Sequence, residues 1–396
     1  MTPEDNQSIL EYGYLSVNHK GEELCGDHVE IGGNEEDGSL TLVLADGLGS
    51  GVEASILSTL TSTLLCKMIE GGMGIEEGVE ALAKTLPVAR DRGNVAYSTF
   101  TLVKVEKDFS ACIYNFDNPD PLLLREGKPH PMAYKEETIG GKRIKKARFY
   151  FGINDTLALY SDGALHAGVG ETLNFGWGEE EISAYLQGLA SPCLSSKNLA
   201  TLLVDHCSLL YNRRPGDDTT CLCLRRREKE KVNLMVGPSS RKEEDRQVLS
   251  SFFALPGKHA VCGGTTCRIV ADYLGVPIRG DLQSLDPDIP PYSLIEGVDL
   301  ATEGVITLNK VLSLAQDYQK DNGAYFTWSY RQDGASLLAN LLFQEGTDIT
   351  FYVGCAVNPA HQEEQGKITF KMKMQIIDNL AHQLRNMGKE VKVLYF

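Results

Sequence analysis

The stretch that most constrains the fold is residues 40–54, which read LTLVLADGLGSGVEA. Its apolar, β-branched run predicts a strand that ends at Asp46 and turns through several glycines. The segment that follows predicts a helix ending near Gly71. Four-residue spacing places one apolar face on this helix, made of Val52, Ile56, Leu60, Leu64 and Met68. A strand that turns directly into a helix can serve a dinucleotide site, a metal site or a plain tight bend.

The dinucleotide interpretation fits the glycines but not the charge. Gly49, Gly51 and Ala54 satisfy the G-x-G-x-x-G/A pattern between a strand and a helix. That site must hold a pyrophosphate, which Asp46 at the mouth of the turn would repel. The second strand of such a fold is also replaced by a second predicted helix at 75–86. We therefore reject a dinucleotide fold here, while an ordinary turn that relieves positive φ angles stays open.

The chain has 396 residues, enough for two domains. The charged run RRREKEK at 225–231 lacks apolar periodicity, as is typical of a solvated linker or a strand end, and separates 1–228 from 232–396. The first part shows many short strands with helices inserted in pairs. This pattern predicts an α+β fold in which packed antiparallel sheets are flanked by helix pairs. Strands and helices alternate in the second part, which predicts a smaller α/β domain with a parallel or mixed sheet.

The composition argues against some classes of binding partner. The formal net charge of −16 argues against non-specific binding to nucleic acid, because phosphate contacts need clustered Lys and Arg. We see no signal peptide and no run of about 18 apolar residues, so we expect no membrane partner. The ten cysteines are scattered through the chain and are best explained as reduced core residues. Together these features favour a cytoplasmic protein.

Three further acidic motifs follow the pattern of Asp46. They are CGDHVEI with Asp27, LYSDGAL with Asp162, and RPGDDTT with Asp217 and Asp218. Each lies at a predicted strand end or turn, so a fold that joins sheet ends would gather their carboxylates. Such a cluster is costly through like-charge repulsion unless cations neutralise it. Oxygen ligands suit Mg²⁺ or Mn²⁺, whereas zinc favours His and Cys.

The ordered set GD, ADGLGSG, YSDGA and DDTT, over roughly residues 10–227, resembles the metal-dependent protein phosphatases (the PPM family). The likeness is to the bacterial subgroup typified by sporulation stage II protein E. It implies a two-sheet antiparallel β-sandwich flanked by helix pairs, with two Mn²⁺ or Mg²⁺ ions. It also implies a protein serine/threonine phosphatase, which hydrolyses phosphoserine or phosphothreonine on a regulatory protein with a water that the ions activate.

Position within these motifs implies the role of each residue. Asp46 would bridge the two ions, and the carbonyl of Gly47 would complete one coordination shell. Asp162 and Asp217 would bind the second ion and, with Asp46, form the catalytic set. Asp27 would bind the cluster directly or through water.

Three further positions of the motifs have no single implied role. Asp218 would support the ligands or bind a third, weaker ion. Ser50 and Leu48 stand where other members carry histidines. The resemblance therefore identifies no general acid among the side chains.

The second part offers a weaker candidate site. Gly263, Gly264, Thr265 and Thr266 lie between a predicted strand and a helix, where backbone N–H groups could hold an anion. Asp299 and Glu303, in a loop before another helix, are further candidates for contact with a ligand. Ordinary capped helices are the preferred explanation of both segments.

Several functional alternatives therefore stay open. We expect the second part to bind a small-molecule effector or a partner and so regulate the phosphatase; a homodimer is also compatible with the sequence. Alternatively, the first part is an inactive scaffold, or the second part is an enzyme in its own right.

Overall fold

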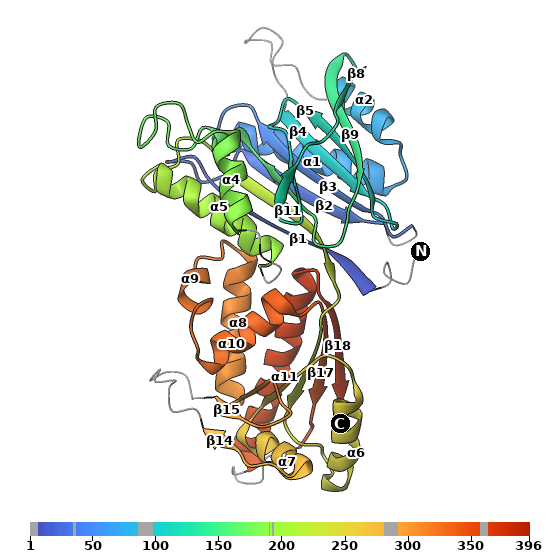
Figure 1. Cartoon of the computed structure of the whole chain (residues 1–396), viewed down its shortest axis with the longest axis vertical. Coiled ribbons are helices and arrows are strands. Elements are labelled where there is room, and N and C mark those ends of the chain that lie inside the picture. Colours follow the sequence, from blue (N-terminus) through green and yellow to red (C-terminus); the bar gives the residue numbers. More distant parts are fainter. Residues whose placement is uncertain are drawn as a thin grey trace. The chain divides into compact units, whose positions relative to one another are not determined.

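The computed structural model describes residues 7–34, 37–85, 98–189, 191, 194–280, 292–356 and 363–396. The chain divides into two compact units, Met1–Glu228 and Lys229–Phe396, hereafter the first and second unit (Figure 1).

The first unit contains two sheets and two pairs of helices, as the sequence predicts. One sheet has five strands in the order β1 (Ser8–Val17), β11 (Thr219–Glu228), β10 (Thr156–Tyr160), β6 (Leu122–Arg125) and β7 (Lys128–His130). The other has six, in the order β2 (Asp27–Gly33), β3 (Leu40–Gly47), β4 (Ser98–Val105), β5 (Ser110–Phe116), β9 (Lys142–Tyr150) and β8 (Lys135–Ile139). All their strand pairs are antiparallel. The helices are α1 (Gly51–Glu70), α2 (Ile75–Thr85), the short α3 (Asp162–Leu165), α4 (Glu179–Leu189) and α5 (Ser196–Leu210).

Strand β3 shows how the sequence builds the layers. Leu42 and Leu44 belong to a core between the two sheets, whereas Val43 and Ala45 belong to a core that the six-stranded sheet shares with α1 and α2. Successive side chains of a strand point to opposite faces, so a strand buried on both faces needs a continuous apolar run. A third core lies between the five-stranded sheet and α4 and α5. The first unit is thus an antiparallel β-sandwich flanked by helix pairs (Figure 1), which confirms the predicted fold class.

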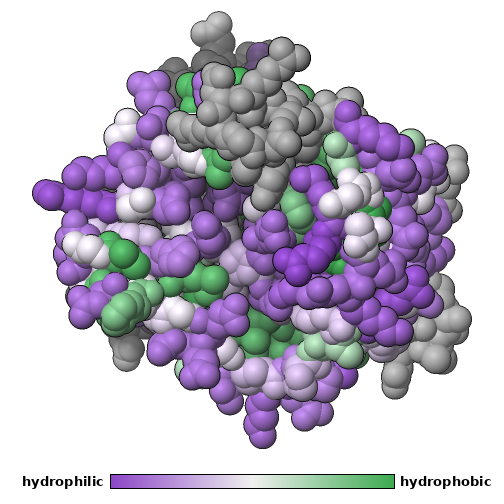
Figure 2. All heavy atoms as spheres, turned by 90° about the horizontal axis from the view of Figure 1, so that it is seen from above, coloured by the Kyte–Doolittle hydropathy of each residue, from purple (hydrophilic) through white to green (hydrophobic). Residues whose placement is uncertain are grey.

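Helix α1 packs with the face opposite to its apolar row. Val52, Ile56, Leu60 and Leu64 are 60%, 53%, 44% and 39% exposed. The buried face consists largely of small or polar side chains, including Ser58, Thr61 and Ser62, which lie against β2 and β3. Small side chains let the helix approach the sheet closely, so the four-residue spacing identifies a shared face but not the packing face. Apolar side chains also form separate patches on the mainly hydrophilic face drawn in Figure 2.

One described helix, α1, has the length and hydropathy of a membrane span. This criterion qualifies the expectation from sequence that no segment is long and apolar enough. The helix packs on β2 and β3, however, and core helices of soluble proteins meet the same criterion.

The basic run at 225–231 is mostly strand. Arg225, Arg226 and Arg227 belong to β11 and are buried. Arg227 Nη1 lies 2.9 Å from Glu11 Oε1, and Arg226 Nη1 donates to the Phe151 carbonyl at 2.9 Å. Of the two interpretations of the run, the strand end is therefore right for these residues, because they belong to β11 and their guanidinium groups have fixed hydrogen-bond partners.

The second unit is a mixed α/β domain, as predicted. Its seven strands have the order β14 (Arg279–Gly280), β15 (Ser293–Leu294), β16 (Leu300–Thr302), β13 (Lys258–Cys262), β12 (Lys231–Val236), β17 (Asp348–Val353) and β18 (Glu390–Tyr395). The helical segments are η3 (Lys242–Glu244), α6 (Asp245–Ala254), α7 (Gly264–Leu274), α8 (Val305–Gln319), α9 (Tyr325–Trp328), α10 (Gly334–Ala339), η4 (Asn340–Glu345) and α11 (Glu363–Asn386). β16, β13, β12, β17 and β18 pair in parallel, whereas β14 and β15 pair antiparallel at one edge. Helices α6 and α7 share an apolar core with one face of the sheet, and α8 packs against α10 and α11.

Candidate metal centre

The six-stranded sheet supplies two of the predicted aspartates as neighbours. β2 begins at Asp27, and the antiparallel register of β2 and β3 pairs Asp27 with Asp46. The next residue, Gly47, ends β3 against the start of α1, where a Cβ on Gly47 would lie 2.1 Å from the Ala54 carbonyl oxygen. Glycine is therefore required here because only it lets the strand end approach the helix so closely.

The five-stranded sheet supplies the other three aspartates. Asp162 begins α3 directly after β10, and Asp217 and Asp218 directly precede β11. The two segments are tied together because Ser161 N–H donates to the Thr220 carbonyl at 3.0 Å and Thr220 N–H donates to Ser161 Oγ at 2.9 Å. All five predicted aspartates thus lie at strand ends or in the turns beside them.

A hydrogen bond from Ser161 joins the two sheets at this corner. Ser161 Oγ donates to Asp27 Oδ2 at 2.7 Å, and both side chains are buried. Sequence reasoning overlooked Ser161, although it directly precedes Asp162 in the YSDG motif. Because Ser161 holds both Asp27 and the Thr220 backbone, it positions the two halves of the cluster against each other.

The aspartates interact strongly with one another. Burial raises the pKa of Asp46 well above its ordinary range, and the nearby charges of Asp27, Asp162 and Asp217 raise it further. The pKa of Asp27 is also raised, mainly by burial, while the hydrogen bond from Ser161 opposes the shift. Burial and the charge of Asp162 raise the pKa of Asp217 to about 6. The raised pKa values of Asp27, Asp46 and Asp217 mean that this corner holds more negative charge than its surroundings compensate.

Among the described residues, two buried carboxylate oxygens have no hydrogen-bond partner, Asp27 Oδ1 and Asp218 Oδ2. The other oxygen of Asp218 accepts the His19 N–H at 2.9 Å. Buried polar atoms are nearly always paired, so unpaired carboxylate oxygens at one corner point to a missing donor or cation. Neither His19 nor Gly26, whose added Cβ would lie 2.6 Å from Asp218 Oδ2, was identified from the sequence.

The donor set fits a hard divalent cation, because it consists of carboxylate and carbonyl oxygens. The type of ligand atom fits such a cation, but the side chains do not form a closed coordination site. Within the described part of the chain, no three Asp, Glu, His or Cys side chains converge on one point closely enough to hold an ion. Ion binding would therefore require these side chains to draw together, which their mutual repulsion opposes in the absence of cations.

In the second unit, the predicted candidates separate into two groups. Gly263, Gly264, Thr265 and Thr266 lie where β13 ends and α7 begins, and Glu303 directly follows β16 at the same end of the sheet. Asp299 lies at the opposite end, because it precedes β16, and its Oδ2 accepts the His259 N–H at 2.7 Å. The structure therefore does not bring Asp299 to the other candidates.

Comparison with known proteins gives a family match within the first unit. Residues 36–227 match the family model described as Stage II sporulation protein E (SpoIIE). Among solved structures, the chain is similar to the PP2C phosphatase domain with a fragment of the regulatory domain of SpoIIE from Bacillus subtilis. That similarity has 19% identity and a TM-score of 0.48, and it covers 56% of this chain and 64% of that chain.

Two further solved structures show a similar level of likeness. The RsbU and RsbW domains of Rv1364c from Mycobacterium tuberculosis share 21% identity at a TM-score of 0.45, covering 62% of this chain and 70% of that chain. RsbX in complex with magnesium shares 18% identity at a TM-score of 0.40, covering 54% of this chain and 94% of that chain. No curated protein sequence matches this chain. At these identities the structural likeness concerns the fold alone.

Proposed function

Because residues 36–227 form a domain of the SpoIIE family of PP2C-type phosphatases, we propose that this protein is a metal-dependent protein serine/threonine phosphatase. The observation that carries the proposal is the corner where both sheets end. There, five aspartates from four motifs interact, and two of their buried carboxylate oxygens are unpaired.

The proposed roles are those that the resemblance of the motifs implies, and the position of these residues at one corner supports them. Asp46 and the Gly47 carbonyl would hold one Mn²⁺ or Mg²⁺ ion, and Asp46, Asp162 and Asp217 would hold a second. When bound, the ions supply an activated water as nucleophile and offset the charge on the phosphoryl oxygens.

Two further aspartates support this set. Asp27 contributes directly or through water, and Ser161 fixes its orientation through the hydrogen bond of 2.7 Å. Asp218 supports the same cluster, since its Oδ1 is held by the His19 N–H.

The proposed substrate is a phosphorylated regulatory protein, and the second unit is a regulatory domain that binds a small-molecule effector. A second copy of the chain is a further partner compatible with this role. We place the protein in the cytoplasm, a proposal supported by the cysteines of the described residues, all of which are free thiols.

The proposal is tested by hydrolysis of a generic aryl phosphate in Mn²⁺, Mg²⁺ or EDTA. We expect turnover that requires the metal and falls at least about 1,000-fold in Asp46→Asn, since that change removes a ligand of both ions. Asp205→Asn is the matched control, because Asp205 is also a part-buried carboxyl with a raised pKa but lies on α5 outside the cluster. Equal turnover in wild type and Asp46→Asn would refute the proposed site.

The second candidate function is a phosphatase-fold scaffold without activity. It is favoured by one observation, that no three metal-ligating side chains of the described residues converge on one point. A scaffold would show neither metal-dependent turnover nor a metal-induced rise in thermal stability. Metal binding without turnover would instead indicate an enzyme held inactive.

A further inference from the structure

Exposed apolar side chains lie beside the aspartates of the metal centre. Leu24 closely precedes Asp27, and Leu48 closely follows Asp46. Both leucines are exposed, as is Val52 in the first turn of α1. Single exposed apolar residues are common on protein surfaces, whereas a group of them beside a site indicates a binding surface.

Backbone contacts place the loop before β2 against the start of α1. Gly47 N–H donates to the Gly26 carbonyl at 3.0 Å, so the end of β3 is tied to this loop. A Cβ on Gly51, the first residue of α1, would meet the Glu22 carboxylate. Leu24 lies between Glu22 and Gly26 along the chain, and therefore beside the turn that carries the other two exposed side chains.

The loop at residues 166–178 carries the same kind of side chain close to Asp162. It directly follows α3, which begins at Asp162. Phe175 in this loop is 94% exposed, more than any other large apolar side chain of the described residues, and Val169 is also exposed. Aromatic side chains supply much of the binding energy at protein interfaces, so this phenylalanine indicates contact with a protein partner.

Hydrogen bonds and a glycine fix the shape of this loop. Leu173 N–H donates to the Gly168 carbonyl at 2.9 Å, and Gly178 N–H donates to the Leu165 carbonyl at 3.1 Å. Gly176 has a φ of +87°, and a Cβ there would lie 2.4 Å from the same Leu165 oxygen. A compact loop that is closed by its own contacts loses little conformational freedom when it binds a partner.

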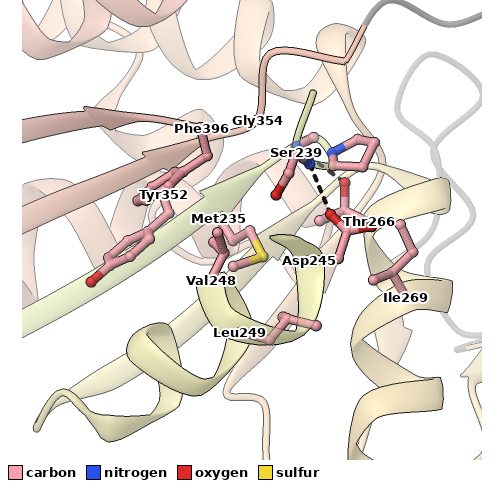
Figure 3. A pocket seen from close by; sticks show the side chains of 12 residues that line it. Met235, Ser239, Asp245, Val248, Leu249, Thr266, Ile269, Tyr352, Gly354 and Phe396 are labelled. Carbon is pink, nitrogen blue, oxygen red and sulfur yellow. Dashed lines mark hydrogen bonds between the residues drawn. The ribbon is translucent and has the colours of Figure 1, made fainter. Parts of the chain in front are cut away.

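The pocket at the ends of β12 and β17 in the second unit does not have such a surface (Figure 3). Met235, Leu249 and Tyr352 line this pocket and are only 5%, 3% and 5% exposed. Its cavity of about 10 Å³ has room for about one water. The apolar side chains there are packed core residues, whereas those beside the metal centre are open to a partner.

The charged groups around the metal centre favour neither sign. In the segments that border it, the exposed positive side chains are Lys20, Arg213 and Arg214, and the exposed negative ones are Glu22, Glu23, Glu53 and Glu171. Glu171 accepts a hydrogen bond from Asn212 Nδ2 at 3.0 Å. Because charges of both signs are mixed here, the apolar side chains are the feature that can select a substrate.

We propose that these apolar side chains select phosphoprotein substrates whose phosphoserine or phosphothreonine has apolar neighbours in the sequence. They form the apolar rim, which consists of Leu24, Leu48, Val52, Val169 and Phe175. The inference rests on the proposed phosphatase function. A phosphate held by the ions lies beside the segments that carry Asp27, Asp46 and Asp162, so the residues that flank it on the substrate contact the rim.

The test compares the binding of peptides in which a non-hydrolysable phosphonate analogue replaces phosphoserine. The peptides differ only at the two positions on either side of the analogue, which are leucine, serine or lysine. Fluorescence anisotropy with the full chain in Mn²⁺ should show that the leucine peptide binds at least about tenfold more tightly than the serine peptide, because it buries apolar surface on the rim. The lysine peptide should bind no more tightly than the serine peptide.

Substitutions on the rim should reduce this preference. Phe175→Ser and Val52→Ser should each lower the ratio of the leucine and serine affinities at least about threefold. Leu64→Ser is the matched control for Val52→Ser, because Leu64 belongs to the same exposed row of α1 but lies about 18 Å farther along the helix axis. It should leave the ratio unchanged. All three side chains are exposed, so their replacement does not disturb a core.

Turnover of an aryl phosphate in Mn²⁺, which has no flanking residues, is measured in parallel and tests the phosphatase function alone. Metal-dependent turnover together with equal affinities for the leucine and serine peptides, as expected if a second copy covers the rim, would reject the rim and retain the phosphatase. The proposal is also overturned if the lysine peptide binds most tightly, or if Leu64→Ser lowers the ratio as much as Val52→Ser. Neither turnover nor peptide binding would reject both proposals.

Discussion

The two units both use glycines to bring chain segments together at strand ends, but the charged groups there differ. In the first unit, aspartates gather where both sheets end, and burial together with mutual repulsion raises the pKa of Asp27, Asp46 and Asp217. In the second, glycines let the loops after β12 and β17 approach each other, and the half-buried ammonium of Lys373 contacts a carbonyl. The first therefore suits cations, whereas the second holds a cationic side chain against a carbonyl oxygen.

The largest expected effect comes from adding a metal ion, which should stabilise the first unit and not the second. Mn²⁺ at 100 times its dissociation constant should stabilise the first unit by about 2.7 kcal/mol. This corresponds to a rise of about 5–10 °C in its unfolding temperature, measured by differential scanning fluorimetry against an EDTA control. Hydrogen exchange should localise the added protection to β2, β3 and the start of α3. Protection centred on β12 and β17 instead would contradict the assignment of the metal site to the first unit.

Glycine substitutions test the close approach of backbone segments that both units show. Gly47→Ala and Gly354→Ala should each cost about 2 kcal/mol of unfolding free energy, because the new Cβ meets backbone oxygen at 2.1 Å and 2.0 Å. Gly49→Ala and Gly275→Ala are the controls. Both have positive φ but nothing within 4 Å of the added Cβ, so strain alone should cost about 1 kcal/mol. Chemical denaturation measures all four, and equal losses within each pair would show that close approach is unimportant.

The smallest expected effect is a gain in stability. Asp46→Asn replaces a buried carboxyl whose pKa is raised by burial and by its neighbours, so at neutral pH the metal-free protein should become about 1 kcal/mol more stable, or about 2–4 °C. Asp205→Asn, outside the cluster, should change stability by less than about 0.5 kcal/mol. A loss of stability in Asp46→Asn under EDTA would mean that the aspartates do not repel one another as described.

The sequence predicts much of the metal centre because its residues lie in short motifs at strand ends. In LTLVLADG, the continuous apolar run indicates that β3 is buried on both faces. Asp46 follows this run, at the point where the strand leaves the core. The order of strands and paired helices likewise predicts the sandwich. Ser161 could have been identified from its place beside Asp162, but its contact with Asp27 depends on how the two sheets pack.

Other features depend on how the elements pack, which the spacing of apolar residues in the sequence does not predict. The row from Val52 to Leu64 identifies one face of α1, yet the opposite face packs, because its small side chains fit closely against the sheet. In the second unit, Gly263–Thr266 could be located as a strand-to-helix turn, whereas Asp299 lies at the other end of the strands. Lys373 carries no local signal, since only the parallel pairing of β12 with β17 brings it beside Gly237 and Gly354.

The central claim is that the five aspartates of the first unit form a divalent metal site. Anomalous X-ray diffraction from crystals grown with Mn²⁺ tests it most directly, because it locates the ions without assuming activity. The account predicts two manganese peaks that share Asp46 as a ligand, with Asp162 and Asp217 at one of them. Well-ordered density for all five aspartates with no manganese peak at Asp46 would contradict it.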